Sequence, residues 1–525
     1  MRPFPEASTL GKADPSAPRV PPAIRPRLTW RYVVCSLIAT YIVYCYIFSK
    51  PLFARPLPEY SGPYPVGAVD IETPLTPPRV IDTARFKDSK EKAFEVETVL
   101  FTLYYPAAPN TTSDKPKHHW VPKPVSVTAE GYAKFAHINN FVVNKLMTRA
   151  VDGLVGSIEI PAQVDVPLAD LAEAVVLDPD TRDDDKEVEK VIQIVKGGHP
   201  VIIFSHGMAS SRTDYTHYAG ELASRGYVVA LLEHRDGSCP GSVVMRNGAP
   251  PKTRLTFDVR DVEAATGRDL TVDEFKRAQL DFREAEIEEA VRVLRLINEG
   301  RGEEIAKQNA RGEGHGADLK TWKGRLNTDD MVVAGHSYGA TGAMQALRGG
   351  PSAARPFKGA IILDPGKQSG RLNDDIRVPV LVVHSNSWSS SRSVFYGRAH
   401  FDTVRDIVEN NVLRGMPSWF ATSLGTSHPS VTDAPLLEPL LLSWTTGARI
   451  DVYEGLRQYV HVAEDFLWFL ATGEKRSLLR EKAEFPEYDE GSGFGVWKPG
   501  QGENETAGGL WWDWRRYWQV HVSPN

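Results

Sequence analysis

The chain has 525 residues, 42% of them hydrophobic, which is enough to bury one large core or two smaller ones. Its net charge is −6, so there is no basic excess and nucleic acid is excluded as an expected partner. The three cysteines are Cys35, Cys45 and Cys239, and two of them lie in one apolar segment, which excludes a disulfide framework.

The N-terminal part divides into a polar leader and an uncharged segment. Residues 1–31 are rich in Pro and Arg and lack apolar periodicity, so we expect a disordered cytosolic tail. Residues 32–49 carry no charge and would extend about 27 Å as a helix, at about 1.5 Å per residue. This length predicts a transmembrane signal anchor, and a cleaved signal peptide is the alternative.

The charges around this segment predict its orientation. Arginines precede it at positions 19, 25, 27 and 31, whereas only Lys50 and Arg55 follow closely. Positive charge is enriched on the cytoplasmic side of membrane spans. We therefore expect a single-pass membrane protein of the secretory pathway, attached through residues 32–49, with a cytoplasmic N-terminus and a lumenal or extracellular catalytic domain.

Three further regions follow. Residues 50–60 are predicted to be a linker, residues 61–480 a catalytic domain, and residues 481–525 a tryptophan-rich C-terminal tail. The tryptophans of this tail suit either a membrane interface or packing against the domain.

The catalytic region alternates apolar runs with helix-like segments. Residues 96–105 predict an early strand of mixed exposure. The later runs have the continuous apolar character of strands covered on both faces, and they lie at residues 201–204, 227–232, 331–334, 360–363 and 380–383. Residues 282–297 show helical spacing. This alternation predicts an α/β fold, a mostly parallel central sheet with helices on both faces.

One pentapeptide indicates the chemistry. Residues 335–339 read Gly-His-Ser-Tyr-Gly, directly after the apolar run 331–334 and before a series of small residues. A Gly-x-Ser-x-Gly between a strand and a helix is the nucleophile elbow of α/β-hydrolases, in which the serine is exposed at the edge of the sheet. The sequence therefore predicts an α/β-hydrolase with Ser337 as its nucleophile.

The serine needs a base and an acid, which follow it in the order Ser, Asp or Glu, His in this fold. Asp364 comes directly after the strand at 360–363, and no acid follows the next strand, so Asp364 is the predicted acid. A simple turn role for it stays open. His428 lies in a loop of small residues and is the predicted base, with His384 and His400 as rivals.

The oxyanion hole is expected from two backbone amides. One belongs to Met208, in the loop after the strand at 201–204, and the other to Tyr338, the residue after the nucleophile. His206 is expected to brace this loop, and residues 234–236 to form a supporting salt-bridge cluster. This chemistry requires no cofactor and no metal.

Several segments resemble one family, the plasma-type platelet-activating factor acetylhydrolases. The matching segments are Ser-Gly-Pro-Tyr at 61–64, Leu-Tyr-Tyr-Pro at 103–106, Phe-Ser-His-Gly at 204–207, Gly-Tyr-Val-Val-Ala at 226–230, Glu-His-Arg-Asp at 233–236 and Gly-His-Ser at 335–337. The resemblance implies a calcium-independent esterase that releases short or oxidised sn-2 acyl groups from glycerophospholipids. It also implies that the triad acid follows the same strand as Asp364, and that the oxyanion amides are those of Met208 and Tyr338.

The expected function is thus a serine esterase working through an acyl-enzyme on phospholipid at a membrane or lipid-particle surface. Two alternatives stay open: a general carboxylesterase or polyester hydrolase on the same fold, and a non-catalytic membrane-anchored scaffold. The sequence carries no prediction of oligomeric state.

Overall fold

The computed structural model describes residues 30–48, 50–170, 197–246, 248–312, 315–439, 445–490 and 517–525. The chain forms two compact units, Met1–Lys50 and Pro51–Asn525. The first contains one described helix, α1 (Trp30–Ile47). Within the described ranges, no helix has both the length and the apolar character needed to cross a membrane.

The predicted transmembrane anchor at residues 32–49 is therefore wrong, and with it the predicted single-pass topology and localisation. The sequence of α1 explains the difference. Its 18 residues include Trp30, Arg31 and four tyrosines, so the purely apolar stretch is shorter than the about 20 residues that span a bilayer. Of the predicted disordered tail, residues 1–31, the first 29 lie outside the described part of the chain and the last two begin α1.

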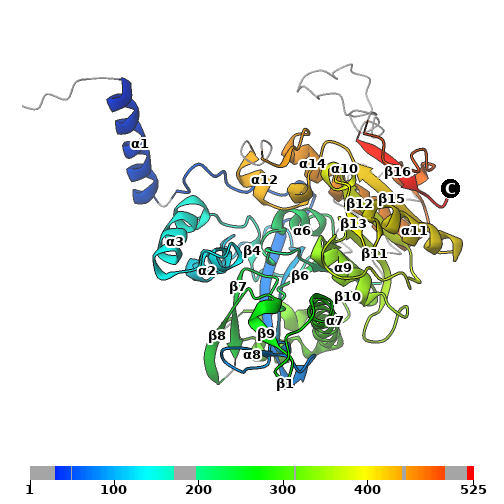
Figure 1. The fold of residues 1–525 in the computed structure, drawn as a ribbon, viewed down its shortest axis with the longest axis horizontal. Coiled ribbons are helices and arrows are strands. Elements are labelled where there is room, and N and C mark those ends of the chain that lie inside the picture. Colours follow the sequence, from blue (N-terminus) through cyan, green and yellow to red (C-terminus); the bar gives the residue numbers. More distant parts are fainter. Residues whose placement is uncertain are drawn as a thin grey trace, which may run out of the picture. The chain divides into compact units, whose positions relative to one another are not determined.

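The second unit is built on a ten-stranded sheet with the strand order β16-β15-β12-β11-β10-β5-β6-β3-β1-β4 (Figure 1). These strands are β1 (Val66–Val80), β3 (Glu95–Pro106), β4 (Gln163–Val164), β5 (His199–Ser205), β6 (Val228–Leu232), β10 (Leu326–His336), β11 (Phe357–Leu363), β12 (Val380–Ser385), β15 (Ser418–Ser423) and β16 (Trp518–Val522).

The six strands from β6 to β15 pair in parallel and form the centre of the sheet. All five predicted apolar runs lie in these strands. Their side chains alternate between two hydrophobic cores: Ile203 faces one, and Ile202 and Phe204 face the other. Burial on both faces explains why these runs are continuously apolar.

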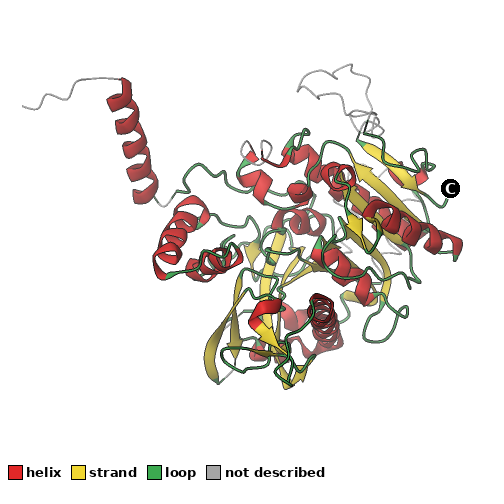
Figure 2. Cartoon of the chain, in the orientation of Figure 1, coloured by secondary structure: helices red, strands yellow, loops and turns green. Residues whose placement is uncertain are grey.

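Helices cover both faces of the sheet, as the layered cartoon in Figure 2 shows. One core takes side chains from α7 (Val272–Leu296), α9 (Tyr338–Ala346) and α11 (His400–Leu413). The opposite core takes them from α6 (Thr216–Ala223) and α14 (Val452–Thr472). This arrangement confirms the predicted α/β-hydrolase architecture.

Antiparallel strands flank the parallel centre on both sides, and the short β4 pairs parallel with β1 at one edge. On one side β3 pairs antiparallel with β6, and β1 with β3. On the other side β16 adds an antiparallel strand from the C-terminal segment, and Trp518 of this strand is buried. The other tryptophans of the predicted tail, at 497, 511, 512 and 514, lie outside the described residues.

The remaining elements surround this framework. They are β2 (Arg85–Phe86), α2 (Val125–Phe135), α3 (Phe141–Val155), β7 (Gly241–Arg246), β8 (Ala249–Leu255), β9 (Val262–Glu263), α8 (Gly302–Gln308), α10 (Asn386–Ser390), β13 (Val394–Phe395), β14 (Arg398–Ala399) and α12 (Ala434–Leu437).

Helix α7 begins ten residues before the predicted helix at 282–297. A capping box starts it: the Thr271 side chain accepts the N–H of Glu274, whose carboxylate accepts the N–H of Thr271. The helix continues as a π turn over Ile297–Arg301, where Gly300 has φ of 97°. The regular α-helix ends at Leu296, and the positive φ of Gly300 interrupts the helical backbone just before α8 begins at Gly302.

Candidate active site

Ser337 lies in the sharp turn between β10 and α9. Its backbone has φ of 57° and ψ of −119°, a strained conformation for a residue with a side chain. Glycines permit the turn. A Cβ on Gly335 would overlap the carbonyl of Gly339, and a Cβ on Gly339 would overlap the carbonyl of Ser205 on the neighbouring strand. The turn therefore needs glycine on both sides of the serine, because strand and helix approach too closely for any larger residue.

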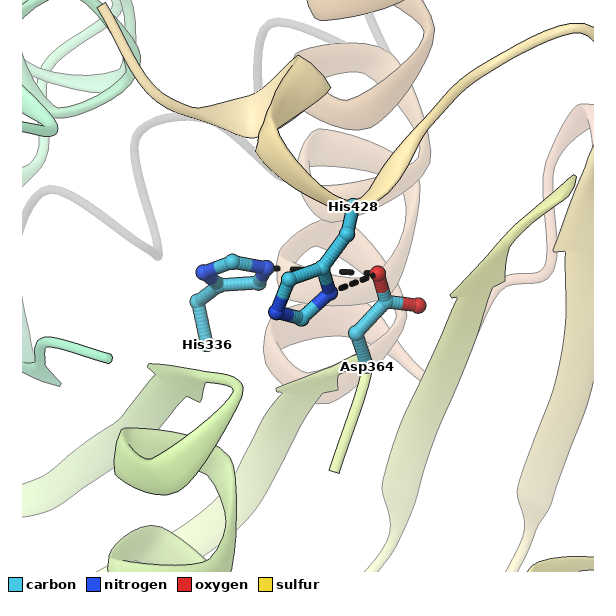
Figure 3. A group of neighbouring side chains, drawn as sticks. All are labelled: His336, Asp364 and His428. Carbon is cyan, nitrogen blue, oxygen red and sulfur yellow. Dashed lines mark hydrogen bonds and ion pairs between the residues drawn. The ribbon is translucent and has the colours of Figure 1, made fainter. Parts of the chain in front are cut away.

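The structure brings three predicted side chains together at the carboxyl ends of the strands. His428 Nε2 lies 3.0 Å from Ser337 Oγ, and His428 Nδ1 lies 2.8 Å from Asp364 Oδ2. Figure 3 shows the His428 ring entering from a loop above the sheet, beside Asp364. Both contacts have hydrogen-bond length, so a continuous relay joins hydroxyl, imidazole and carboxylate.

Asp364 is held in place by Ser385, the last residue of the next strand, β12. Its Oδ1 accepts the N–H of Ser385 at 2.6 Å, and its Oδ2 accepts the Ser385 hydroxyl at 2.7 Å. The residue is only 2% exposed. These two donors fix the orientation of the carboxylate and leave one lone pair of Oδ2 directed at His428.

The segment that follows Ser385 holds His428. The Ser387 hydroxyl accepts the backbone N–H of His428 at 2.9 Å. The Trp388 ring stacks on the imidazole, with ring centroids 4.0 Å apart and an interplanar angle of 11°. The plane of the base is thus set by an aromatic face and its backbone by a hydrogen bond.

Ser385, Ser387 and Trp388 were not predicted from the sequence. Their position gave a signal, because Ser385 ends β12 and the other two follow it directly, at the edge where the carboxyl ends of the parallel strands meet. That segment contains no acid, so the sequence predicted no part for it in the site. Serine and tryptophan residues that only position other side chains are not marked by any sequence motif.

His336, the residue before the nucleophile, packs against His428 with ring centroids 4.4 Å apart. Burial, together with the neighbouring His428, holds the pKa of His336 well below its usual value. Its Nδ1 lies 2.9 Å from the Tyr215 hydroxyl, whose oxygen accepts the N–H of Gly207. This neutral ring therefore links the elbow to the loop that contains Met208.

His336, Asp364 and His428 place ligand-type atoms within 4.8 Å of one another, the one such group of three in the described ranges. Their geometry suits hydrogen bonding better than metal ligation. Both ring nitrogens of His428 are engaged, by Asp364 and Ser337, and Nδ1 of His336 is engaged by Tyr215. A metal ion would have to break the relay.

The predicted oxyanion donors lie beside the nucleophile. A Cβ added to Gly207 would lie 3.2 Å from the Ser337 Cβ, so the backbone leading into Met208 runs next to the serine. Among the described residues, no hydrogen bond is formed by the N–H of Met208 or of Tyr338. Both residues line the cavity that contains Ser337.

His206 braces this loop, as expected. Its Nε2 accepts the N–H of His234 at 3.0 Å, so Nδ1 carries the proton and donates to the Gly207 carbonyl at 2.7 Å. Burial lowers the pKa of His206 to about 4, which keeps the ring neutral.

Beneath the loop lies the expected cluster of residues 234–236, organised by a guanidinium that the sequence analysis missed. Arg283 of α7 is fully buried and pairs with Asp236 at 2.8 Å. It also donates to the His206 carbonyl at 2.7 Å and lies 4.5 Å from the Tyr338 ring centroid. One side chain thus supports both halves of the candidate oxyanion hole.

This cluster contains a second serine–histidine–carboxylate array. The Ser205 hydroxyl lies 2.7 Å from His234 Nε2, and His234 Nδ1 lies 2.6 Å from Glu286. All three side chains are buried, and Arg283 also donates to the Ser205 oxygen. Ser205 therefore has no access for a substrate, which leaves Ser337 as the reactive candidate.

The other predicted alternatives take structural places. His384 is fully buried in β12, where its ring packs against Phe420. His400 begins α11 and is also buried. Cys239 is buried with its thiol 3.4 Å from Glu233, and burial raises the pKa of that thiol. None of these side chains has a recorded contact with Ser337 or Asp364 in the described structure.

A cavity of about 820 Å³ opens at Ser337. Its lining includes Met208, Tyr338, Trp388 and the segments 366–370 and 393–396. The volume lies within the range of about 300–1,000 Å³ that small-molecule sites occupy.

The comparisons with known proteins agree with this geometry. A family model described as "Platelet-activating factor acetylhydrolase, isoform II" matches residues 185–478, which is more than half of the chain and includes every candidate site residue. The segments at 61–64 and 103–106 lie outside that match.

Two curated relatives are similar over a long part of the chain. A platelet-activating factor acetylhydrolase from Cavia porcellus is 26% identical over 59% of this chain and 55% of its own length. A putative phospholipase A2 from Schizosaccharomyces pombe is 28% identical over 52% of this chain and 68% of its own. The chain thus aligns with about half to two thirds of these relatives.

Among solved structures, a ferulic acid esterase from Streptomyces cinnamoneus covers 82% of this chain and 97% of its own. The TM-score is 0.44 and the identity 17%, a similarity too low to inform the reaction. The family match rests instead on 294 contiguous residues that contain the elbow, the acid and the base. The chain belongs to the platelet-activating factor acetylhydrolase isoform II family.

Proposed function

We propose that this protein is a serine esterase that hydrolyses the sn-2 acetyl, or short or oxidised acyl, ester of glycerophospholipids through an acyl-enzyme. The observation that carries the proposal is the hydrogen-bonded relay of Ser337, His428 and Asp364, which opens into a cavity in a chain of this family.

Acylation begins with attack of Ser337 Oγ on the ester carbonyl carbon. His428 Nε2 accepts the hydroxyl proton, and Asp364 stabilises the imidazolium and holds its Nδ1 proton. The N–H groups of Met208 and Tyr338 donate to the negative oxygen of the tetrahedral intermediate. The intermediate collapses when the bond to the glycerol oxygen breaks and His428 returns the proton to that oxygen, releasing a lysophospholipid.

Deacylation repeats these steps with water. His428 accepts a proton from a water molecule, which attacks the acyl carbon attached to Ser337. The same two amides stabilise the second intermediate, and its collapse restores the serine hydroxyl and releases the free acid. The neutral His336 beside the base adds no competing positive charge.

The substrate class follows from the relatives, which are named as a platelet-activating factor acetylhydrolase and a putative phospholipase A2. Such substrates are lipids, so the reaction is proposed to occur at a membrane or lipid-particle surface. A general carboxylesterase on the same fold is less favoured, since the family match covers all the candidate site residues.

Hydrolysis of 2-acetyl and 2-palmitoyl phosphatidylcholine by the purified full chain tests the proposal, with Ser337→Ala as the control. We expect turnover of the 2-acetyl lipid by the wild type, little turnover of the 2-palmitoyl lipid, and none by the variant. Equal rates on both lipids would contradict the acyl preference, and turnover by Ser337→Ala near the wild-type rate would contradict the mechanism.

A further inference from the structure

The cavity at Ser337 is lined by two lysines and one carboxylate, and the lysines have no acidic partner. Lys276 belongs to α7, and Lys367 to the loop after β11. In the described structure neither ammonium forms an ion pair. Asp273 also lines the cavity and precedes Lys276 by three positions on the same helix, but it forms no ion pair with either lysine. Both lysine side chains thus line the cavity without an ion-pair partner among the described residues.

Lys276 lies beside the residue that follows the nucleophile. Its Nζ is 4.8 Å from the Tyr338 ring centroid and donates to the side-chain oxygen of Gln279 at 3.2 Å. Burial lowers the pKa of this lysine, which means that its charge is incompletely compensated.

Lys367 lies on the side of the base. Its Nζ is 4.4 Å from the centroid of Trp388, the ring that stacks on His428. It donates to the carbonyls of Trp388 and Ser391, at 2.8 and 2.7 Å, and an ammonium has a third N–H to offer. Burial lowers the pKa of Lys367 to about 8.

Lys367 is therefore one side chain, Trp388, away from the base, and Lys276 lies beside the residue that follows the nucleophile; both line the same cavity. A partly buried positive charge without an acid is costly unless an anion joins it. Glycerophospholipids contain such an anion, the phosphodiester, only a few bonds from the sn-2 ester. We propose that Lys276 and Lys367 bind the phosphate group of the substrate while its sn-2 carbonyl lies at Ser337.

This inference rests on the proposed function and adds to it a means of substrate selection. A neutral glycerol ester would leave both ammonium groups unpaired, whereas a phospholipid would pair them. The position of the lysines favours the phosphodiester over a carboxylate at the far end of an oxidised acyl chain. The phosphate is at a fixed short separation from the reacting ester, but the separation of a terminal carboxylate changes with chain length.

The test compares two substrates with the same sn-2 acetyl ester: a water-soluble 1-alkyl-2-acetylglycerophosphocholine with a short alkyl chain, and the matching 1-alkyl-2-acetylglycerol, which lacks the phosphate. The quantity measured is the ratio of kcat/KM for the phospholipid to kcat/KM for the neutral ester. Lys276→Met and Lys367→Met remove the charges, Lys276→Arg and Lys367→Arg keep them, and the exposed Lys307→Met of α8 is the matched control.

We expect each methionine variant to lower this ratio by about tenfold to a hundredfold, mainly through KM, as for the loss of a hydrogen bond to a charged group. The arginine variants should recover most of the ratio, and Lys307→Met should match the wild type. If the methionine variants slow both substrates equally, the lysines only brace the site and the inference is overturned.

A third substrate, 2-glutaroyl glycerophosphocholine, separates the two possible anions. If the methionine variants affect this lipid but leave the 2-acetyl lipid unchanged, the lysines bind an acyl carboxylate and the inference is again overturned. A wild type that hydrolyses the neutral ester but no phospholipid would refute the proposed substrate class itself, an outcome distinct from the failure of the lysine variants.

Discussion

Replacing Asp364 with Asn changes the proton arrangement of the relay while keeping its shape. The carboxylate Oδ1 accepts the backbone N–H of Ser385 at 2.6 Å, a donor whose direction is fixed. An asparagine must therefore keep its carbonyl oxygen at this position, because the opposite orientation would set two N–H donors against each other. Its NH₂ group then takes the place of Oδ2, 2.8 Å from Nδ1 of His428.

This orientation forces the wrong tautomer on the base. Nδ1 must then accept a hydrogen bond, so the imidazole proton moves to Nε2, the nitrogen that faces the Ser337 hydroxyl. A protonated Nε2 cannot accept the serine proton. We expect kcat to fall by about 10⁴-fold, the size of the effect when a Ser-His-Asp triad is held in this tautomer. This corresponds to about 5.4 kcal/mol of activation free energy.

The assay is steady-state hydrolysis of 2-acetyl phosphatidylcholine, with the free energy of unfolding measured in urea on the same samples. Asp329→Asn makes the same chemical change at a side chain that is 94% exposed, and should leave kcat unchanged. An Asp364→Asn enzyme that folds like the wild type and keeps kcat within tenfold of it would refute the tautomer argument.

Three further predictions follow from contacts at and away from the site. Trp388→Ala should lower kcat about a hundredfold, because the His428 ring would lose the aromatic face that sets its orientation. Trp388→Phe keeps an aromatic ring there and should lower kcat less; equal losses of kcat in the two variants would contradict the stacking role. Gly339→Ala should cost about 3 kcal/mol of stability in urea titrations, whereas Gly153→Ala in α3, where a Cβ would make only an ordinary contact of 3.4 Å with Leu52, should cost nothing; similar values for both would contradict the close approach. Burial lowers the pKa of His521 to about 4, so the unfolded chain takes up a proton below about 6.5 that the folded protein does not. The unfolding free energy should therefore decline as pH falls from about 6.5 to 4, by up to about 1.4 kcal/mol per pH unit from this group, and His521→Gln should remove that share; an unchanged slope would contradict it.

The strands at the centre of the sheet were predictable because burial on both faces leaves a strong sequence signal. Residues 201–204 and 380–383 are apolar without interruption, and both became parallel strands. Strand β15 was not predicted, although all six of its residues are buried. Its sequence, Ser-Trp-Phe-Ala-Thr-Ser, mixes apolar and hydroxyl residues. The Thr422 hydroxyl bonds to His521, and the Ser418 hydroxyl accepts the side-chain N–H of Asn411, so these partners lie outside the strand.

The positions of Ser337, Asp364 and His428 were predictable because the fold fixes their order and places the first two directly after strands. The segment 385–388, which holds the acid and the base, was not. Its side chains act through two hydrogen bonds and a ring contact that exist only when distant parts of the chain are folded together.

Prediction from composition failed for α1. The absence of charge over residues 32–49 suggested a membrane span. A span requires a continuous apolar stretch of sufficient length as well as the absence of charge. Tyrosines, Ser36 and Thr40 interrupt the apolar character of this helix. Among the described residues no helix meets both requirements.

The most direct test of the central claim is to identify by peptide mass spectrometry the serine that a fluorophosphonate probe modifies. The account predicts that Ser337 alone is labelled, and that a soluble 2-acetyl glycerophospholipid slows the labelling by competing for the same cavity. Labelling of Ser205, which has its own buried histidine and carboxylate, or no labelling of the folded protein, would contradict the account.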